Sequence, residues 1–138
     1  MYKMVENPFF MKIEAIQPSQ LYLNSQKIEK VIEQYEVINP EHIKAVPIKN
    51  LNNEIIFTDG HTRAYILWLH GFKKIKVTWE DELLDWKAYQ ICVGWCKNEG
   101  ITRISDLKMR VIDNESYQKK WIKRCQDMFS ELEKKKRD

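Results

Sequence analysis

The pattern of apolar and polar residues predicts four β-strands in the first 80 residues. In the last of them, Ile75, Val77 and Trp79 alternate with polar residues, as expected for a strand with one buried face. Asn52 and Asn53 separate the middle two strands and are typical of a hairpin turn. The predicted strands are residues 9–16, the end of the segment 39–51, residues 54–59 and residues 73–80.

Two helices are predicted among these strands. In the segment 25–35 apolar residues recur at helical spacing, and Ser25 stands where a helix cap is needed. The segment 64–72 is mostly apolar and predicts a short buried helix that ends at Gly71. The predicted order is therefore strand, helix, hairpin, helix, strand.

From about Asp81 onward the apolar residues recur at helical spacing, and no strand is predicted. Ser105 is expected to cap a helix in the segment 106–112, and a final helix is expected to begin near Asn114. We expect the aromatic residues of this region to pack its helices against the sheet. The first of these helices lies within residues 80–100, with an apolar stripe formed by Leu84, Ala88, Ile91 and Trp95 and an end at Gly100.

These elements predict an α+β fold, with a small mixed β-sheet, helices and a C-terminal α-helical extension. The chain has 138 residues, of which 43% are hydrophobic, and this is enough to form a core. We expect one domain in residues 1–80 and a helical extension in residues 81–138 that packs on it.

Charge limits the class of partner. The net charge is +3, and Glu133–Asp138 carry four positive and two negative charges, so the rest of the chain is close to neutral. This argues against a broad nucleic-acid surface, and the segment 96–112 resembles a helix-turn-helix only faintly. No segment has the roughly 20 apolar residues that cross a membrane, and no signal core begins the chain, so a cytoplasmic location is expected.

The cysteines predict reduced thiols. Cys92, Cys96 and Cys125 are odd in number, and the first two lie four residues apart in a predicted helix. This arrangement does not suit a disulfide framework, and it misses the usual ligand spacings of structural zinc sites.

The segment Thr58–Arg63 combines several chemically active groups between a strand and a helix. A sharp turn through Gly60 leaves backbone N–H groups unpaired at the helix start, where an anion such as phosphate is favoured. Arg63 matches phosphate oxygens, Thr62 offers a hydroxyl, and His61 donates a hydrogen bond or transfers a proton. Asp59 is expected to hold Mg²⁺ or to accept a proton from a substrate hydroxyl.

The same residues also have a purely structural interpretation. Thr58 or Asp59 would cap the helix, and Gly60 would accept a positive φ. Arg63 would form a surface ion pair, and His61 would be a hydrogen-bonded turn residue. The sequence alone leaves both interpretations open.

Two segments, "MKIEAIQPSQLYLNSQKIEKVIEQY" and "IKAVPIKNLNNEIIFTDGHTRAYILWLHGFKKIKVTW", resemble the ParB/sulfiredoxin-like superfamily, and within it the branch of free-serine kinases. The resemblance covers roughly residues 10–80, and "TDGHTRA" is its most specific part. It implies that the loop containing Gly60, His61, Thr62 and Arg63 binds the phosphates of ATP or ADP with Mg²⁺. It also implies transfer of a phosphoryl group to a small hydroxylated molecule such as free serine.

Differences from the family pattern narrow the function. His61 occupies the position of the sulfiredoxin nucleophilic cysteine, so a sulfinic-acid reductase is not expected. The chromosome-partitioning branch has a Gly-Glu-Arg-Arg loop, whereas His61 and Thr62 stand in its two middle positions here. A nuclease, a label often given to this superfamily, would need a cluster of metal-binding carboxylates, and only Asp59 stands near the loop.

The first loop lacks the acidic residue that serves as base in the serine-kinase branch. No Asp or Glu lies between Glu14 and Glu29, and Gln20 can orient a substrate hydroxyl but cannot take its proton. Asp59 and His61 are therefore the candidate catalytic residues, with Gln20 as a substrate contact. The alternative is a non-catalytic nucleotide-sensing module that regulates partners or associates with DNA. The sequence indicates no oligomeric state.

Overall fold

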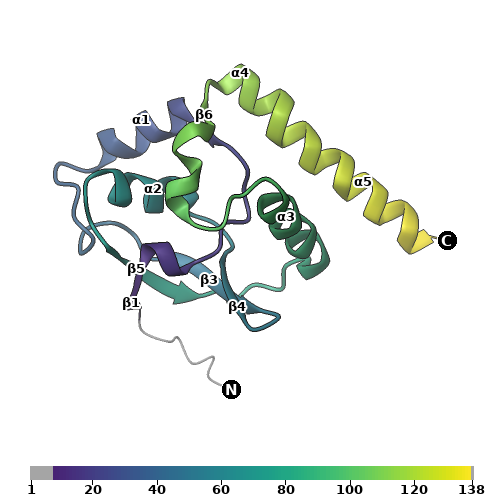
Figure 1. Cartoon of the computed structure of the whole chain (residues 1–138), viewed down its shortest axis with the longest axis horizontal. Helices are drawn as coiled ribbons and strands as arrows, with labels where there is room; N and C mark the ends of the chain where they lie inside the picture. The colour runs from purple at the N-terminus through teal and green to yellow at the C-terminus, as the bar shows by residue number, and fades with distance from the viewer. Residues whose placement is uncertain (1–7, 138) are drawn as a thin grey trace.

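The computed structural model describes residues 8–137 and confirms the α+β class with a C-terminal helical extension (Figure 1). Its strands are β1 (Phe9–Lys12), β2 (Leu23–Asn24), β3 (Val46–Leu51), β4 (Glu54–Phe57), β5 (Lys74–Trp79) and β6 (Val111–Ile112). Its α-helices are α1 (Ser25–Gln34), α2 (His61–Leu69), α3 (Trp86–Asn98), α4 (Asn114–Tyr117) and α5 (Lys123–Arg137). Short 3₁₀ helices η1 (Ile13–Ala15) and η2 (Ile104–Arg110) and a π-helical segment η3 (Gln118–Ile122) complete the described chain.

The main sheet is mixed and has the strand order β1-β5-β3-β4. The β3–β4 hairpin turns through Asn52 and Asn53, which have φ values of 54° and 67°, as the sequence predicts for this pair. β3 and β5 are parallel, so the chain between them crosses over the sheet, and α2 forms part of that crossover. This topology places the start of α2 directly after the end of β4.

Helix α2 is the central helix of the core. Its side chains Ile66 and Leu67 are fully buried, which agrees with the short buried helix predicted from the sequence. The helix begins at His61, three residues before its predicted start, so part of the loop predicted to bind phosphate is its first turn.

Two predicted helix caps are wrong. The side chain of Asn24, not Ser25, caps α1 by accepting a hydrogen bond from the Gln26 N–H at 3.0 Å. Ser105 also does not act as a cap, because its hydroxyl donates to a carboxylate oxygen of Glu14 at 2.7 Å. The first helix thus begins one residue earlier than predicted, and in the second case the distant Glu14 takes the Ser105 hydroxyl.

The prediction that no strand follows residue 81 is also wrong. The segment expected to form a helix at 106–112 is the 3₁₀ helix η2 followed by β6, and β6 pairs in parallel with β2. The predicted stripe of α3 is also shifted, since the helix begins at Trp86 after Leu84, and its buried residues are Ala88, Cys92, Val93 and Cys96. Pairing with the distant strand β2 explains why residues 111–112 form a strand. Packing against α5 contributes to the shifted buried face of α3.

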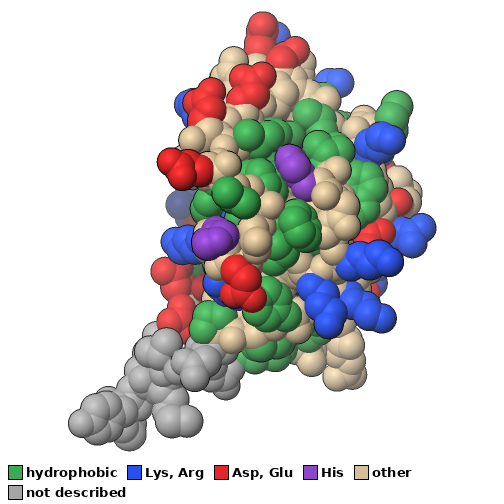
Figure 2. Space-filling view, turned by 90° about the vertical axis from the view of Figure 1, so that its left-hand side faces the viewer, with side chains coloured by type: hydrophobic (Ala, Val, Ile, Leu, Met, Phe, Trp, Pro, Cys, Tyr) green, Lys and Arg blue, Asp and Glu red, His purple; other side chains and the backbone are tan. Residues whose placement is uncertain are grey.

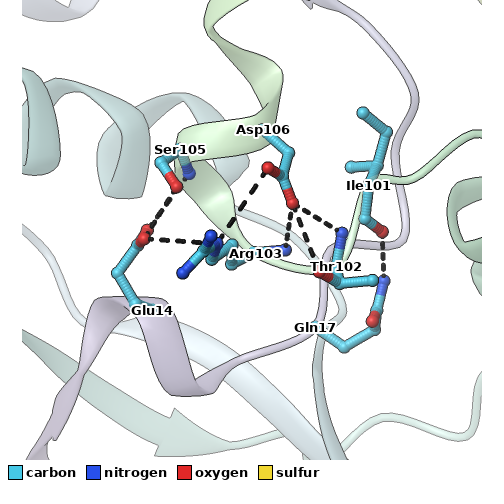
Figure 3. Close-up of polar contacts among 7 residues, drawn as sticks. All are labelled: Glu14, Gln17, Ile101, Thr102, Arg103, Ser105 and Asp106. Carbon is cyan, nitrogen blue, oxygen red and sulfur yellow. Dashed lines mark hydrogen bonds and ion pairs between the residues drawn. The ribbon is translucent and has the colours of Figure 1, made fainter.

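Polar contacts join the extension to the first loop of the chain (Figure 3). The Gln17 side chain donates to the Ile101 carbonyl at 2.9 Å, and Glu14 accepts from Ser105 and lies 3.9 Å from Arg103. One cluster of buried hydrophobic residues contains members from both parts, including Ile13 and Trp121. Figure 1 shows α3 between the sheet and the long C-terminal helix α5.

The surface drawn in Figure 2 carries acidic as well as basic side chains around a central hydrophobic area. Among residues 8–137, no helix is both long enough and apolar enough to span a membrane. The same residues contain no group of three or more His, Cys, Asp or Glu side chains placed to hold a metal ion together.

Candidate functional site

The turn into α2 depends on Gly60. Its φ of 76° is left-handed, and it occupies the N-cap position without a side chain to cap the helix. A Cβ atom there would lie 2.8 Å from Val46 Cγ1 and 2.8 Å from Arg63 Nη2. Glycine is therefore required both for the backbone angle and for the close packing against β3. The first N–H groups of α2 consequently have no side-chain cap from this position.

His61 is held in one tautomer. The loop after η1 pairs with β4 through the hydrogen bonds Gln17 N–H to Ile55 O and Phe57 N–H to Gln17 O, and this places Ser19 beside α2. The Ser19 N–H donates to His61 Nε2 at 2.9 Å, so the ring proton resides on Nδ1. Burial, with a smaller opposing effect from Asp59, lowers the pKa of His61 to about 3. The ring is therefore neutral near pH 7.

The Nδ1–H of His61 is a buried hydrogen-bond donor. The residue is 3% exposed, and among the described residues Nδ1 has no hydrogen-bond partner. Leaving such a donor unpaired costs about 1–3 kcal/mol, so a ligand that supplies an acceptor would be favoured here. A neutral imidazole serves as a hydrogen-bond donor through this atom but has no extra proton to release as an acid.

Arg63 contacts the backbone of the loop before β3. Its Nη1 donates to the carbonyls of Lys44 at 3.0 Å and Ala45 at 3.1 Å, while its Nη2 lies beside Gly60. The guanidinium thus joins this loop to the start of α2. The bidentate phosphate contact expected from the sequence would require Nη1 to leave these carbonyls or Nη2 and Nε to serve instead, so that role stays a prediction.

Thr58 and Glu80 form a polar pair next to the turn. The Thr58 hydroxyl donates to Glu80 Oε1 at 2.7 Å and lies 3.2 Å from the Pro47 carbonyl, so it does not cap α2. The Tyr89 hydroxyl of α3 donates to the Thr58 carbonyl at 2.8 Å. Burial, together with Glu80 and Asp59, raises the pKa of Tyr89 to about 12. These contacts fix the strand end that leads into Gly60.

Asp59 and Thr62 differ in their exposure to solvent. Asp59 is exposed, whereas Thr62 is 4% exposed. The negative charge of Asp59 contributes to the pKa of His61, Tyr89 and Tyr117. Asp59 is therefore accessible to an ion or ligand that approaches the start of α2.

A cavity of about 200 Å³ adjoins this turn. Its lining comes from the first loop, from the start of α2 and from helices of the extension: Ser19, Gln20, Thr58, His61, Ala88, Tyr89, Cys92, Trp121, Cys125, Met128 and Phe129. This volume is below the 300–1,000 Å³ that is usual for drug-sized ligands. The cavity therefore fits a small molecule or one part of a larger one.

Gln20 lies in the lining of this cavity, as its predicted role requires. Its amide nitrogen donates to the Tyr22 carbonyl at 2.8 Å and to the Tyr117 hydroxyl at 3.0 Å. The structure thus brings Gln20 and His61 to one cavity, with the exposed Asp59 close to His61. Sequence reasoning missed Glu80, Tyr89 and the two cavity cysteines, because only tertiary packing brings these residues beside the loop.

Comparison with solved structures finds a distant likeness. The crystal structure of protein Atu1540 from Agrobacterium tumefaciens superposes with a TM-score of 0.48 at 11% sequence identity. The match covers 79% of this chain and 63% of that chain, so this chain spans less than two thirds of that protein. No protein-family model and no curated protein matches the sequence. The resemblance to the ParB/sulfiredoxin-like superfamily accordingly stays a prediction.

Proposed function

We propose that the chain binds ATP or ADP by the phosphates at the start of α2. The observation that carries this proposal is the buried Nδ1–H of His61, which has no partner within residues 8–137 and lies beside a helix start whose N-cap, Gly60, has no side chain. Helix N–H groups and the helix dipole favour an anion at this position, and the imidazole supplies one further donor. The base and ribose of the nucleotide would lie outside the cavity, because its volume is too small for a whole nucleotide.

The proposed reaction is phosphoryl transfer to a small hydroxylated molecule such as free serine, which the cavity is large enough to hold. Gln20 would orient the substrate hydroxyl, and the exposed Asp59 would accept its proton. Phosphoryl transfer depends mainly on positioning and on stabilisation of charge, so one well-placed carboxylate suffices as base.

Mg²⁺ fits this arrangement only if Asp59 and the nucleotide phosphates bind the ion together. Proteins commonly bind Mg²⁺ through one or two carboxylates together with substrate phosphates, and Asp59 is an accessible carboxylate beside the proposed phosphate position. The nearby carboxylate of Glu80 accepts hydrogen bonds at both oxygens, from Thr58 and from the Glu82 N–H. When bound, the ion would neutralise charge on the phosphates.

A non-catalytic nucleotide sensor is the second candidate. It is favoured by the neutral state of His61 and by the contacts that hold Arg63 Nη1 on the carbonyls of Lys44 and Ala45. In this candidate the same phosphates bind, but no residue completes the transfer.

Phosphorus NMR separates the two candidates. The full chain is incubated with ATP, Mg²⁺ and a mixture of free amino acids and small alcohols, and a new phosphorylated product is expected. Asp59→Asn should abolish the product and leave calorimetric binding of ATP without Mg²⁺ within about twofold, because it removes the base and the proposed ion ligand but none of the phosphate donors. Asp127→Asn, at an exposed carboxylate of α5, is the matched control and should retain activity.

The possible failures have different meanings. Binding without any product favours the sensor over the kinase. Product that persists in Asp59→Asn assigns the proton transfer to another residue. Absence of calorimetric binding of both ATP and ADP in the presence of Mg²⁺ overturns both candidates.

A further inference from the structure

Two cysteines from different helices meet at the cavity wall. Cys92 belongs to α3 and Cys125 to α5, and both line the cavity. The two thiols interact strongly enough to shift each other's pKa. Cys96, one turn after Cys92, is fully buried and is not part of the cavity lining. The chain therefore contains one facing thiol pair and one separate thiol.

The packing of α3 against α5 keeps this pair together. The rings of Trp95 and Trp121 meet edge to face with centroids 6.1 Å apart. Arg124 stacks on Trp95 at 4.2 Å and lies 3.5 Å from a carboxylate oxygen of Glu99. These contacts lie near the two thiols in sequence and hold α3 against α5.

The two thiols have unequal reactivity. The hydrogen bond from Cys92, reinforced by the nearby Arg124 charge, lowers the pKa of Cys125 below its usual value. The same hydrogen bond and burial raise the pKa of Cys92. Cys125 is also half-buried, whereas Cys92 is 8% exposed. We therefore expect a small oxidant to react first with the Cys125 thiolate, and the Cys92 thiol to react next with the oxidised Cys125.

We propose that Cys92 and Cys125 are a peroxide-sensitive pair that forms a disulfide between α3 and α5 at the wall of the cavity. The Cys125 thiolate attacks one oxygen of hydrogen peroxide, so that an S–O bond forms and the O–O bond breaks. The departing hydroxide becomes water by taking a proton from solvent, which balances the proton that Cys125 released on ionisation. The Cys92 sulfur then attacks Sγ of the Cys125 sulfenic acid, the S–S bond forms, and hydroxide leaves with the Cys92 proton as a second water. The two thiols lose two electrons in total, which the peroxide gains.

The disulfide would fix the wall formed by α3 and α5. It closes a covalent loop from residue 92 to residue 125, which removes freedom from the unfolded chain. Formation of this disulfide depends only on the two thiols and does not require the cavity to bind any particular ligand.

The test uses the full chain, treated with a small excess of hydrogen peroxide and then analysed without reductant. The intact mass should fall by about 2 Da for the two lost hydrogens, and free thiols should fall from three to one. Peptide mapping should join the Cys92 and Cys125 peptides. Cys96→Ser is the matched control and should still form the link.

A second variant, Cys92→Ser, tests separately whether Cys125 is the thiol that peroxide oxidises. In Cys92→Ser the sulfenic acid of Cys125 has no resolving thiol, so dimedone should label Cys125, whereas the unmodified chain should show little label. Oxidation of the unmodified chain should raise the thermal midpoint by on the order of 5–10 °C, and dithiothreitol should reverse the change. A link that involves Cys96, links only between two chains, or three thiols that survive peroxide would overturn the proposal.

Discussion

The backbone N–H of Ser19 donates to Nε2 of His61 at 2.9 Å and thereby assigns the ring proton to Nδ1. Nδ1 is buried and has no partner among the described residues, so His61, which lines the cavity, carries one unused donor. The imidazole is therefore a fixed, neutral hydrogen-bond donor, and its contribution does not require a change in its charge near pH 7.

The first prediction concerns Gly60. Gly60→Ala should lower the free energy of unfolding by at least about 2 kcal/mol, because alanine resists the left-handed angle and its Cβ would collide with Val46. Urea denaturation of the purified chain measures this. Gly94→Ala is the control: it lies within α3, with nothing within 4 Å of the added Cβ, and should stabilise by about 0.5–1 kcal/mol. Equal effects of the two changes would contradict the proposed role of Gly60.

The second prediction concerns pH. The pKa of His61 is about 3 in the folded chain and about 6.5 in the unfolded chain, so below pH 6.5 the unfolded state binds the additional proton. Stability should therefore fall with acid from this group, by about 1 kcal/mol between pH 6 and pH 5.

The matched variant for the pH experiment is His61→Gln. Its amide oxygen can still accept from the Ser19 N–H, but the side chain does not titrate. Urea denaturation at pH 6 and pH 5 should show a smaller loss in this variant than in the unmodified chain. His42→Gln, at an exposed histidine, should behave like the unmodified chain. The same pH slope in all three proteins would mean that His61 is not buried in its neutral form.

The third prediction concerns the helical extension. A chain that ends at Glu80 should lose cooperative thermal unfolding, because it exposes apolar core surface and leaves the Gln17 amide without the Ile101 carbonyl. A chain that ends at Leu132, the last buried residue of α5, should remain within about 0.5 kcal/mol of the full chain. A cooperative, monomeric Glu80-terminated chain would show that residues 1–80 fold independently.

Local sequence determined some elements of this fold and not others. The Asn52–Asn53 hairpin and the apolar run of α2 follow from preferences that operate within a few residues, and both agree with the structure. β6 could not be predicted in this way, because the pairing of Val111 with Leu23 joins positions far apart in the chain. Distant partners overrode the local helical pattern there.

The candidate site shows the same division. The turn at Gly60 was predictable because the glycine, the preceding strand and the apolar helix are adjacent in sequence. Two contacts depend on how β5 and α3 pack: the hydrogen bond of Thr58 to Glu80 and the hydrogen bond of Tyr89 to the Thr58 carbonyl. No sequence spacing predicts them. The orientation of Arg63 toward backbone carbonyls likewise depends on the loop before β3.

The position of the phosphates is the central claim, and NMR of the backbone amides of the ¹⁵N-labelled full chain tests it most directly. The chain is titrated with ADP and, separately, with adenosine, both in the presence of Mg²⁺. ADP should shift the amide resonances of His61, Thr62 and Arg63, because phosphate oxygens accept from the first N–H groups of α2, while adenosine should leave these three unchanged. Shifts confined to the basic residues 134–137, or equal shifts of the α2 amides with adenosine, would contradict phosphate binding at the start of α2.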